Sequence, residues 1–113
     1  MTRIVAAVGQ HVTGKKHWLE AESIIIQTLR EYIDHTDTVY VTNGGGVVPV
    51  VSARYAKERR LSVWYERASS SLKTIESMAE KADIAFVFGD NDWVDQMETI
   101  FDEAGVHVHR VSL

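Results

Sequence analysis

Two patterns of apolar and polar residues alternate along this chain, one typical of strands and one typical of amphipathic helices. Residues 3–8 and 84–88 are apolar almost throughout, as expected for strands buried on both faces. Residues 38–42 and 61–65 are rich in β-branched and aromatic residues, which favours two more strands. Residues 106–111 alternate valine with polar side chains, which is typical of a half-exposed edge strand.

Between these runs, apolar residues recur at steps of three and four, which predicts four amphipathic helices. The first helix follows a polar stretch and has Trp18, Ala21, Ile25, Leu29 and Tyr32 on one face. The second spans residues 47–60, with Val47, Val51 and Tyr55 on one face. The inner positions of the third are Leu72, Ile75, Met78 and Ala82, and those of the fourth are Val94, Met97, Phe101 and Ala104.

Residues that commonly cap the two ends of helices lie next to the predicted helices. Ser69, Ser70 and Ser71 are candidate N-caps for the third helix, and Asp92 is the candidate for the fourth. Asp95 suits the positive end of the fourth helix, and Gly105 closes it. The strict alternation of strands and helices predicts an α/β fold. We expect residues 1–113 to form a single Rossmann-like three-layer domain, with a five-stranded parallel sheet in the order 3-2-1-4-5 and helices on both faces.

Composition narrows the class of protein. The chain is 45% hydrophobic and 25% charged and carries a net charge of -4, which is ordinary for a globular domain and gives no basic stripe for nucleic acid. No apolar run reaches the length of a membrane span, and the first residues do not have the layout of a signal peptide. The absence of cysteine agrees with a reducing compartment. We therefore expect a cytoplasmic protein that binds neither nucleic acid nor membrane.

Three consecutive glycines, Gly44, Gly45 and Gly46, separate the second strand from the second helix, and Pro49 lies in the first turn of that helix. Glycines allow a ligand to approach backbone N–H groups at the positive end of a helix, where a phosphate is favoured. The alternative is that the glycines only allow a tight turn and close packing. We call these three residues the glycine turn.

Two further turns reach the same edge of the predicted sheet, after Gly9 and after Gly89. Because ligands bind beyond the carboxyl ends of the strands in such folds, we expect Gly9, Asn43 and Gly89 to line the site. Asp90 and Trp93 are expected to face a ribose or a base.

Other patterns offer weaker alternatives. Gly9 to Lys15 fits the spacing of a P-loop, which predicts ATP binding through Lys15, but Lys16 replaces the Ser or Thr that holds magnesium. The acidic residues after Gly89 could bind a metal, although capping already explains two of them. His107 and His109 share one strand face, yet no third ligand lies nearby in sequence. We expect no metal and no cofactor.

The glycine turn and the small apolar residues that follow it, GGGVVPVVSARYA, resemble the GGGxxGLMGxVAxxA pattern of the SLOG superfamily. This Rossmann-like group contains the LONELY GUY phosphoribohydrolases, lysine-decarboxylase-like proteins and small YspA-like proteins. Residues 78–83, MAEKAD, are similar to the M-x-x-x-A-D that precedes a second family motif, PGGxGTxxE. The resemblance implies a site for a nucleotide or a nucleotide-derived ligand that bears a phosphate.

LONELY GUY enzymes cleave an N-glycosidic bond with an arginine and a glutamate. The corresponding positions here are Thr74 and Gln96, neither of which can do that chemistry at neutral pH. The resemblance therefore implies ligand binding first. The alternative is a nucleoside 5'-monophosphate phosphoribohydrolase with shifted groups, Asp95 as the carboxylate and Lys73 or Arg67 as the cation. The resemblance also implies a homodimer or higher homo-oligomer, with Trp18 as a candidate contact.

Overall fold

A computed structural model describes residues 2–69 and 71–113. Its strands are β1 (Ile4–Gly9), β2 (Thr38–Thr42), β3 (Ser62–Glu66), β4 (Ile84–Phe88) and β5 (His107–Val111). Its helices are α1 (Lys15–Tyr32), α2 (Val47–Glu58), α3 (Lys73–Ala79) and α4 (Asp92–Glu103). The alternation confirms the predicted α/β class, and the ends of the elements differ from the predicted ones by only a few residues.

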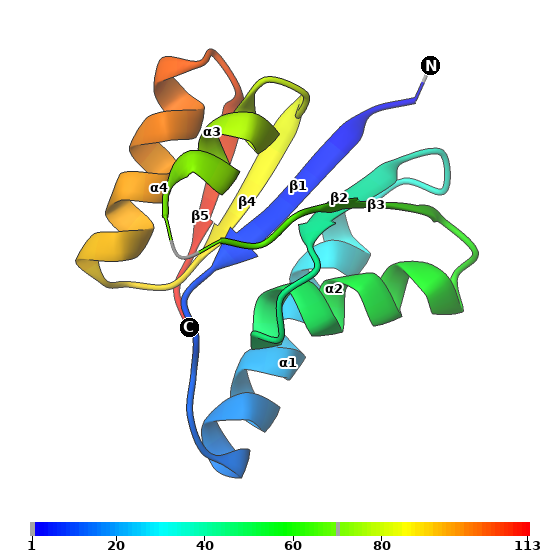
Figure 1. The fold of residues 1–113 in the computed structure, drawn as a ribbon. Coiled ribbons are helices and arrows are strands. Elements are labelled where there is room, and N and C mark those ends of the chain that lie inside the picture. Colours follow the sequence, from blue (N-terminus) through cyan, green and yellow to red (C-terminus); the bar gives the residue numbers. More distant parts are fainter. Residues whose placement is uncertain (1, 70) are drawn as a thin grey trace.

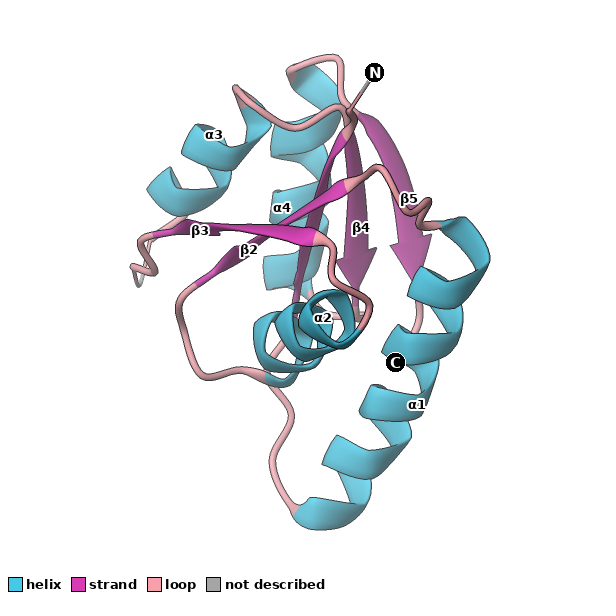
Figure 2. Cartoon of the chain, turned by 90° about the vertical axis from the view of Figure 1, so that its right-hand side faces the viewer, coloured by secondary structure: helices cyan, strands magenta, loops and turns pink. Residues whose placement is uncertain are grey.

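The strands form a parallel sheet in the order β3-β2-β1-β4-β5, as predicted. Figures 1 and 2 show α1 and α2 on one face of the sheet and α3 and α4 on the other. The register pairs Gly9 with Phe88 and Thr42 with Glu66, so the carboxyl ends of four strands lie along one edge. Because the connections on the two sides of β1 lead to opposite faces, a crevice is expected at this edge.

Each face of the sheet has its own apolar core. The cluster on the α1 and α2 face is built around Ile25, Leu29, Val51 and Phe86. The cluster on the α3 and α4 face is built around Met78, Val87, Val94 and Phe101. Side chains of β4 enter both clusters, which explains why residues 84–88 are apolar without alternation.

The two edge strands, β3 and β5, are more exposed than the inner strands. Trp64 and Tyr65 on β3 keep 46% and 49% of their surface exposed. Trp64 packs edge-to-face on Tyr40, with ring centroids 6.1 Å apart, whereas Tyr65 lies under the ammonium of Lys57. The half-exposed character predicted for residues 106–111 is confirmed by β5.

Some local predictions are wrong. Asn91, rather than Asp92, caps α4, because its side-chain oxygen accepts the N–H of Val94 at 2.9 Å. The N-cap position of α3 is Leu72, which offers no side-chain cap. Ser71 accepts only a 3.3 Å bond from the N–H of Lys73, and Ser70 lies outside the described residues.

The exposure of two further side chains bears on the predictions. Trp18 is half-buried against the core on the α1 and α2 face, in line with its place in the apolar spacing of this helix, and its role as an oligomer contact stays a prediction. Ala104 is exposed rather than part of the inner face of α4, because the helix has already ended there. Within the described ranges, we find no helix with the length and apolar character needed to cross a membrane.

Candidate functional site

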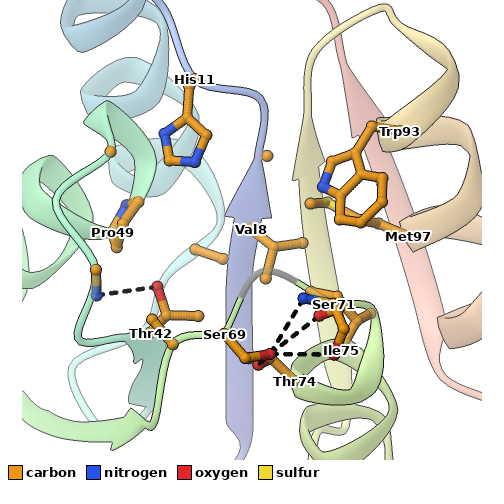
Figure 3. Close-up of a pocket in the computed structure, with 15 residues that line it drawn as sticks. Val8, His11, Thr42, Pro49, Ser69, Ser71, Thr74, Ile75, Trp93 and Met97 are labelled. Atoms are coloured by element: carbon orange, nitrogen blue, oxygen red, sulfur yellow. Dashed lines mark hydrogen bonds between the residues drawn. The ribbon is translucent and has the colours of Figure 1, made fainter.

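A cavity of about 120 Å³ opens at the carboxyl edge of the sheet, beside the end of β1. The segments that follow β1, β2, β3 and β4 all contribute to it, and Figure 3 shows their side chains around Val8. His11 and Trp93 lie on opposite sides of the cavity in this view. The cavity therefore occupies the crevice that the strand order predicts.

The walls of this cavity are partly apolar and partly hydroxyl-bearing. Val8 and Met97 supply apolar surface, whereas the connection from β3 to α3 brings Ser69, Ser71 and Thr74. The hydroxyls of Ser69 and Thr74 are 2.7 Å apart and hydrogen-bonded. Hydroxyls can rotate to donate to an anion. No Asp, Glu, Lys or Arg occurs among the described residues that line the cavity, so hydroxyls and backbone N–H groups would hold an anion there.

The three glycines of the glycine turn have different surroundings. A Cβ at Gly44 would lie 3.3 Å from Cβ of Ala68, and a Cβ at Gly46 would lie 2.6 Å from Nδ1 of His11. A Cβ at Gly45 would meet open space, and Gly45 does not line the cavity. Close packing, the alternative considered from the sequence, thus constrains Gly44, whereas Gly46 closely approaches only the exposed ring of His11, which can turn away, and packing does not constrain Gly45.

Helix α2 begins at the border of the cavity, where Gly46 and Pro49 form part of the lining. Gly46 is the N-cap residue, and no side chain caps this helix among the described residues. The N–H groups of Val47 and Val48 have no partner within the helix, as is general for a first turn, and both residues are fully buried and do not line the cavity. This turn also has no acidic residue, so nothing in it offsets the positive end of the helix. An anion is the ligand that such an end favours.

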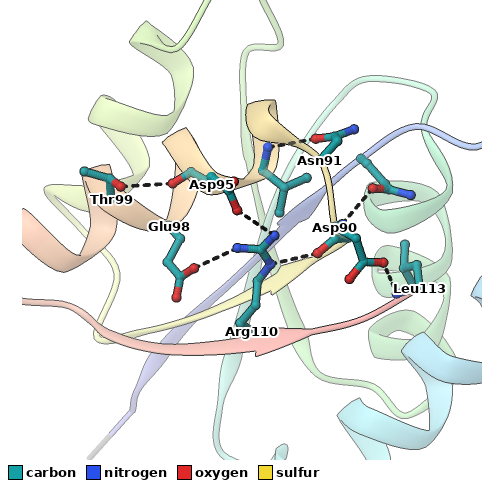
Figure 4. A network of polar contacts seen from close by, with 10 residues as sticks. Asp90, Asn91, Asp95, Glu98, Thr99, Arg110 and Leu113 are labelled. Atoms are coloured by element: carbon teal, nitrogen blue, oxygen red, sulfur yellow. Dashed lines mark hydrogen bonds and ion pairs between the residues drawn. The ribbon is translucent and has the colours of Figure 1, made fainter.

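The turn after β4 is built differently, because its polar groups already bind other parts of the chain (Figure 4). The N–H of Asp90 donates to the side-chain oxygen of Gln10 at 2.9 Å, and the Asp90 carboxylate accepts the N–H of Leu113 at 3.1 Å. Gly89 has a φ of 132°, and the Gln10 side chain occupies the place of a Cβ there. Gly89 and Asp90 do not line the cavity.

Arg110 of β5 completes the network around this turn. Its Nε donates to the carbonyl of Gly89 at 2.7 Å, and its guanidinium pairs with Asp95 at 2.9 Å and Glu98 at 2.7 Å. Partial burial lowers the pKa of Arg110, but hydrogen bonds to the two carboxylates outweigh this and raise the pKa above its ordinary value. Asp95 therefore faces a permanent cation of the same domain.

The structure brings only some of the predicted ligand-binding residues together. The cavity is lined by Gly9, Gly44, Gly46 and Trp93. Asn43 does not line it, because its side-chain oxygen accepts the N–H of Ala68 at 2.8 Å and braces the connection after β3.

The residues of the alternative functions lie outside the cavity. Lys15 is exposed at the start of α1, which lies away from the sheet edge (Figure 1). Asp95 and Lys73 do not line the cavity either. Arg67 also lies outside the lining, and its carbonyl oxygen accepts a hydrogen bond from the Thr74 hydroxyl at 3.2 Å. The geometry thus gives no specific support to a P-loop or to a shifted catalytic pair.

Sequence reasoning missed two parts of the lining, His11 and the hydroxyls of Ser69, Ser71 and Thr74. A signal for the hydroxyls was present, since the serines follow the third strand and its carboxyl end had to reach the same edge. Their spacing from the next helix instead favours an interpretation as N-caps, and Thr74 stands out only as the counterpart of the family's arginine. His11 stands inside the P-loop-like stretch, where no pattern marks it.

No group of three or more His, Asp or Glu side chains suited to a metal ion is found in the described part of the chain. The rings of His107 and His109 are 4.8 Å apart. His109 stacks on Phe86, with ring centroids 5.1 Å apart. Desolvation, followed by the neighbouring His107, lowers the pKa of His109.

Comparisons of this chain with protein-family models, with curated proteins and with solved structures return no match. The class that the fold itself defines is a Rossmann-like α/β protein with a cavity at the point where the strand order reverses.

Proposed function

We propose that this protein binds a nucleotide or a nucleotide-derived ligand, and that it holds the phosphate of the ligand at the glycine turn. In this proposal the chain is a binding domain of the SLOG type rather than an enzyme. The phosphate would accept hydrogen bonds from the N–H groups at the start of α2 and from the hydroxyls of the facing wall.

One observation carries the proposal: the crevice cavity borders the start of α2, and among the described residues no side chain caps this start and the polar side chains that line the cavity are hydroxyls and His11, without a carboxylate. A carboxylate in this place would repel a phosphate. The bound anion would instead meet the positive end of a helix.

Trp93 is the residue that favours a ring-bearing ligand over a simple anion. It lies at the first turn of α4, borders the cavity and keeps 40% of its surface exposed. An exposed indole beside a cavity with apolar and hydroxyl-bearing walls offers a face on which a base can stack.

The test is a calorimetric titration with AMP, adenosine and inorganic phosphate. We expect AMP to bind more tightly than adenosine, because adenosine lacks the anion. Trp93→Ala should weaken AMP binding by about fivefold or more, the lower end of what stacking of a base on an aromatic side chain provides. Trp64→Ala is the matched control, because Trp64 is similarly exposed but packs on Tyr40, outside the cavity.

Equal affinity for AMP and adenosine, or no binding of either, would contradict the proposal. Equal loss in Trp93→Ala and Trp64→Ala would show that the indole at the cavity has no special role.

A further inference from the structure

The size of the cavity limits what it can enclose. Ligand pockets commonly measure about 300–1,000 Å³, whereas this cavity measures about 120 Å³. It therefore encloses the phosphate and only part of the remaining ligand, and the rest of a nucleotide-sized molecule must lie beyond its rim.

A second hollow adjoins the cavity on the other side of the glycine turn. This groove has a volume of about 430 Å³ and runs between α2 and the end of β3. The cavity and the groove share Thr42, Gly44 and Pro49. The two hollows meet at these residues, where Cβ of Ala68 and the hydroxyl of Thr42 lie beside Gly44. A ligand with its phosphate at this junction would extend toward both hollows.

The groove has its own aromatic side chain, which parallels the role of Trp93 in the cavity. Tyr65 lines the groove and is 49% exposed. Trp93 and Tyr65 thus belong to separate hollows that meet at Gly44, so each hollow can hold one ring.

The charge of the groove suits a ligand that is anionic. Arg54 is already paired, with Glu22 at 3.1 Å and more loosely with Glu58 at 3.9 Å. Lys57 has no ion pair among the described residues, and its ammonium lies 5.4 Å from the centroid of the Tyr65 ring. Of the charged side chains that line the groove, Glu58 lies 3.9 Å from Arg54, which leaves Lys57 as the cation that can contact a phosphate or the face of a base.

We propose that the ligand is a dinucleotide, with its linking phosphates at Gly44, one nucleoside partly enclosed by the cavity and resting on Trp93 at its rim, and the second nucleoside on Tyr65 in the groove. The inference rests on the proposed function, since it requires the phosphate to lie at the glycine turn. It assigns Tyr65 and Lys57 as residues that distinguish a dinucleotide from a mononucleotide.

The experiment compares AMP with di(adenosine-5') diphosphate, two AMP units joined through their phosphates, by calorimetry. The dinucleotide should bind about tenfold more tightly than AMP, within the range that one added base stack provides. Tyr65→Ala should reduce the dinucleotide affinity to about that of AMP and leave AMP affinity within about twofold. Trp64→Ala is the control, because Trp64 precedes Tyr65 on β3 and has similar exposure, yet packs on Tyr40 outside the groove.

The outcomes separate the two proposals. If AMP binds and the dinucleotide binds no more tightly, the dinucleotide inference is wrong and the proposed function stands. The inference is also wrong if Tyr65→Ala weakens AMP as much as the dinucleotide, since a mononucleotide would then occupy both spaces. If neither compound binds, both proposals fail together.

Discussion

The turns that follow β2 and β4 are similar in sequence and position but differ in how the helix after each turn begins. Both contain glycine at the carboxyl edge of the sheet, and both lead into a helix that starts there. The helix after β4 is capped by Asn91, and the turn before it binds Gln10, Leu113 and Arg110. No side chain in the described part of the chain caps the helix after β2, and the start of this helix borders a cavity.

The difference shows which glycine turn is suited to a ligand. The polar groups of the turn after β4 are satisfied within the protein, so a ligand there would have to displace existing hydrogen bonds. In the turn after β2, the N–H groups of Asn43 and Gly44 also have internal acceptors, on Glu66 and Thr42. No side chain caps the start of α2 among the described residues, and this is where we propose that a phosphate binds. A helix start without a side-chain cap therefore indicates a candidate binding turn better than the count of glycines does.

The largest predicted effect is on Gly9, which lies between the two turns. A Cβ there would be 2.3 Å from the carbonyl oxygen of Phe88 and 2.9 Å from Cγ2 of Val48. The Phe88 carbonyl belongs to the backbone of the neighbouring strand and cannot move away without distorting the sheet. Gly9→Ala should therefore lower the free energy of unfolding by about 3 kcal/mol. Chemical denaturation measures this, and a loss below about 1 kcal/mol would contradict the packing that we describe around β1.

Arg110→Met should lower the free energy of unfolding by less than Gly9→Ala does, and it should affect only the turn after β4. The substitution removes the hydrogen bond to Gly89 and the pairs with Asp95 and Glu98. Because the side chain is 25% exposed, we expect a loss of about 1.5 kcal/mol. Hydrogen exchange should accelerate around Gly89 and not at the glycine turn. Equal acceleration at both turns would mean that they are not independent.

Removing the N-cap of α4 should lower stability by a smaller amount, and the adjacent Asp92 provides a control. Asn91→Ala should lower the free energy of unfolding by about 1 kcal/mol, because the N–H of Val94 loses its acceptor. Asp92→Ala should cost about 0.5 kcal/mol or less, since that side chain acts only through the helix dipole. Thermal denaturation of the two variants measures both losses of stability. A larger loss in Asp92→Ala than in Asn91→Ala would assign the cap to Asp92.

Gly45→Ala should have the smallest effect on stability. Its Cβ would meet open space, and its backbone does not have a positive φ. We expect the free energy of unfolding to change by about 0.5 kcal/mol or less, with a gain favoured because alanine restricts the unfolded chain. Gly44→Ala should be less stable than Gly45→Ala, because its Cβ approaches Ala68 at 3.3 Å. The reverse order of stability would contradict the assigned surroundings of the two glycines.

The fold was predictable from the sequence because each strand and helix is indicated by a pattern of apolar residues that runs along the whole element. The apolar run of residues 84–88 indicated an inner strand, and helical spacing placed Ile25 and Leu29 in the core, where both are buried. Regular alternation of strands and helices then left few possible strand orders. Helix caps were less predictable, because Asn91 and Asp92 are adjacent and both are good N-caps.

The site was predictable only in its position. The sequence placed Gly9, Gly44, Gly46 and Trp93 at one edge, and all four line the cavity. It could not reveal that Asn43 binds the N–H of Ala68 or that Asp90 binds the N–H of Leu113. These bonds join residues that are 25 and 23 positions apart, and only the folded arrangement of the loops decides whether a side chain binds inward or toward a ligand.

The most direct test of the central claim is a nuclear magnetic resonance titration of the labelled protein with AMP, which reports each backbone N–H separately. The account predicts saturable shifts that are largest at Gly44, Gly46, Val47 and Val48, with little change at Gly89 and Asp90. Shifts concentrated at Gly89 and Asp90, or no saturable shift at the glycine turn, would contradict it.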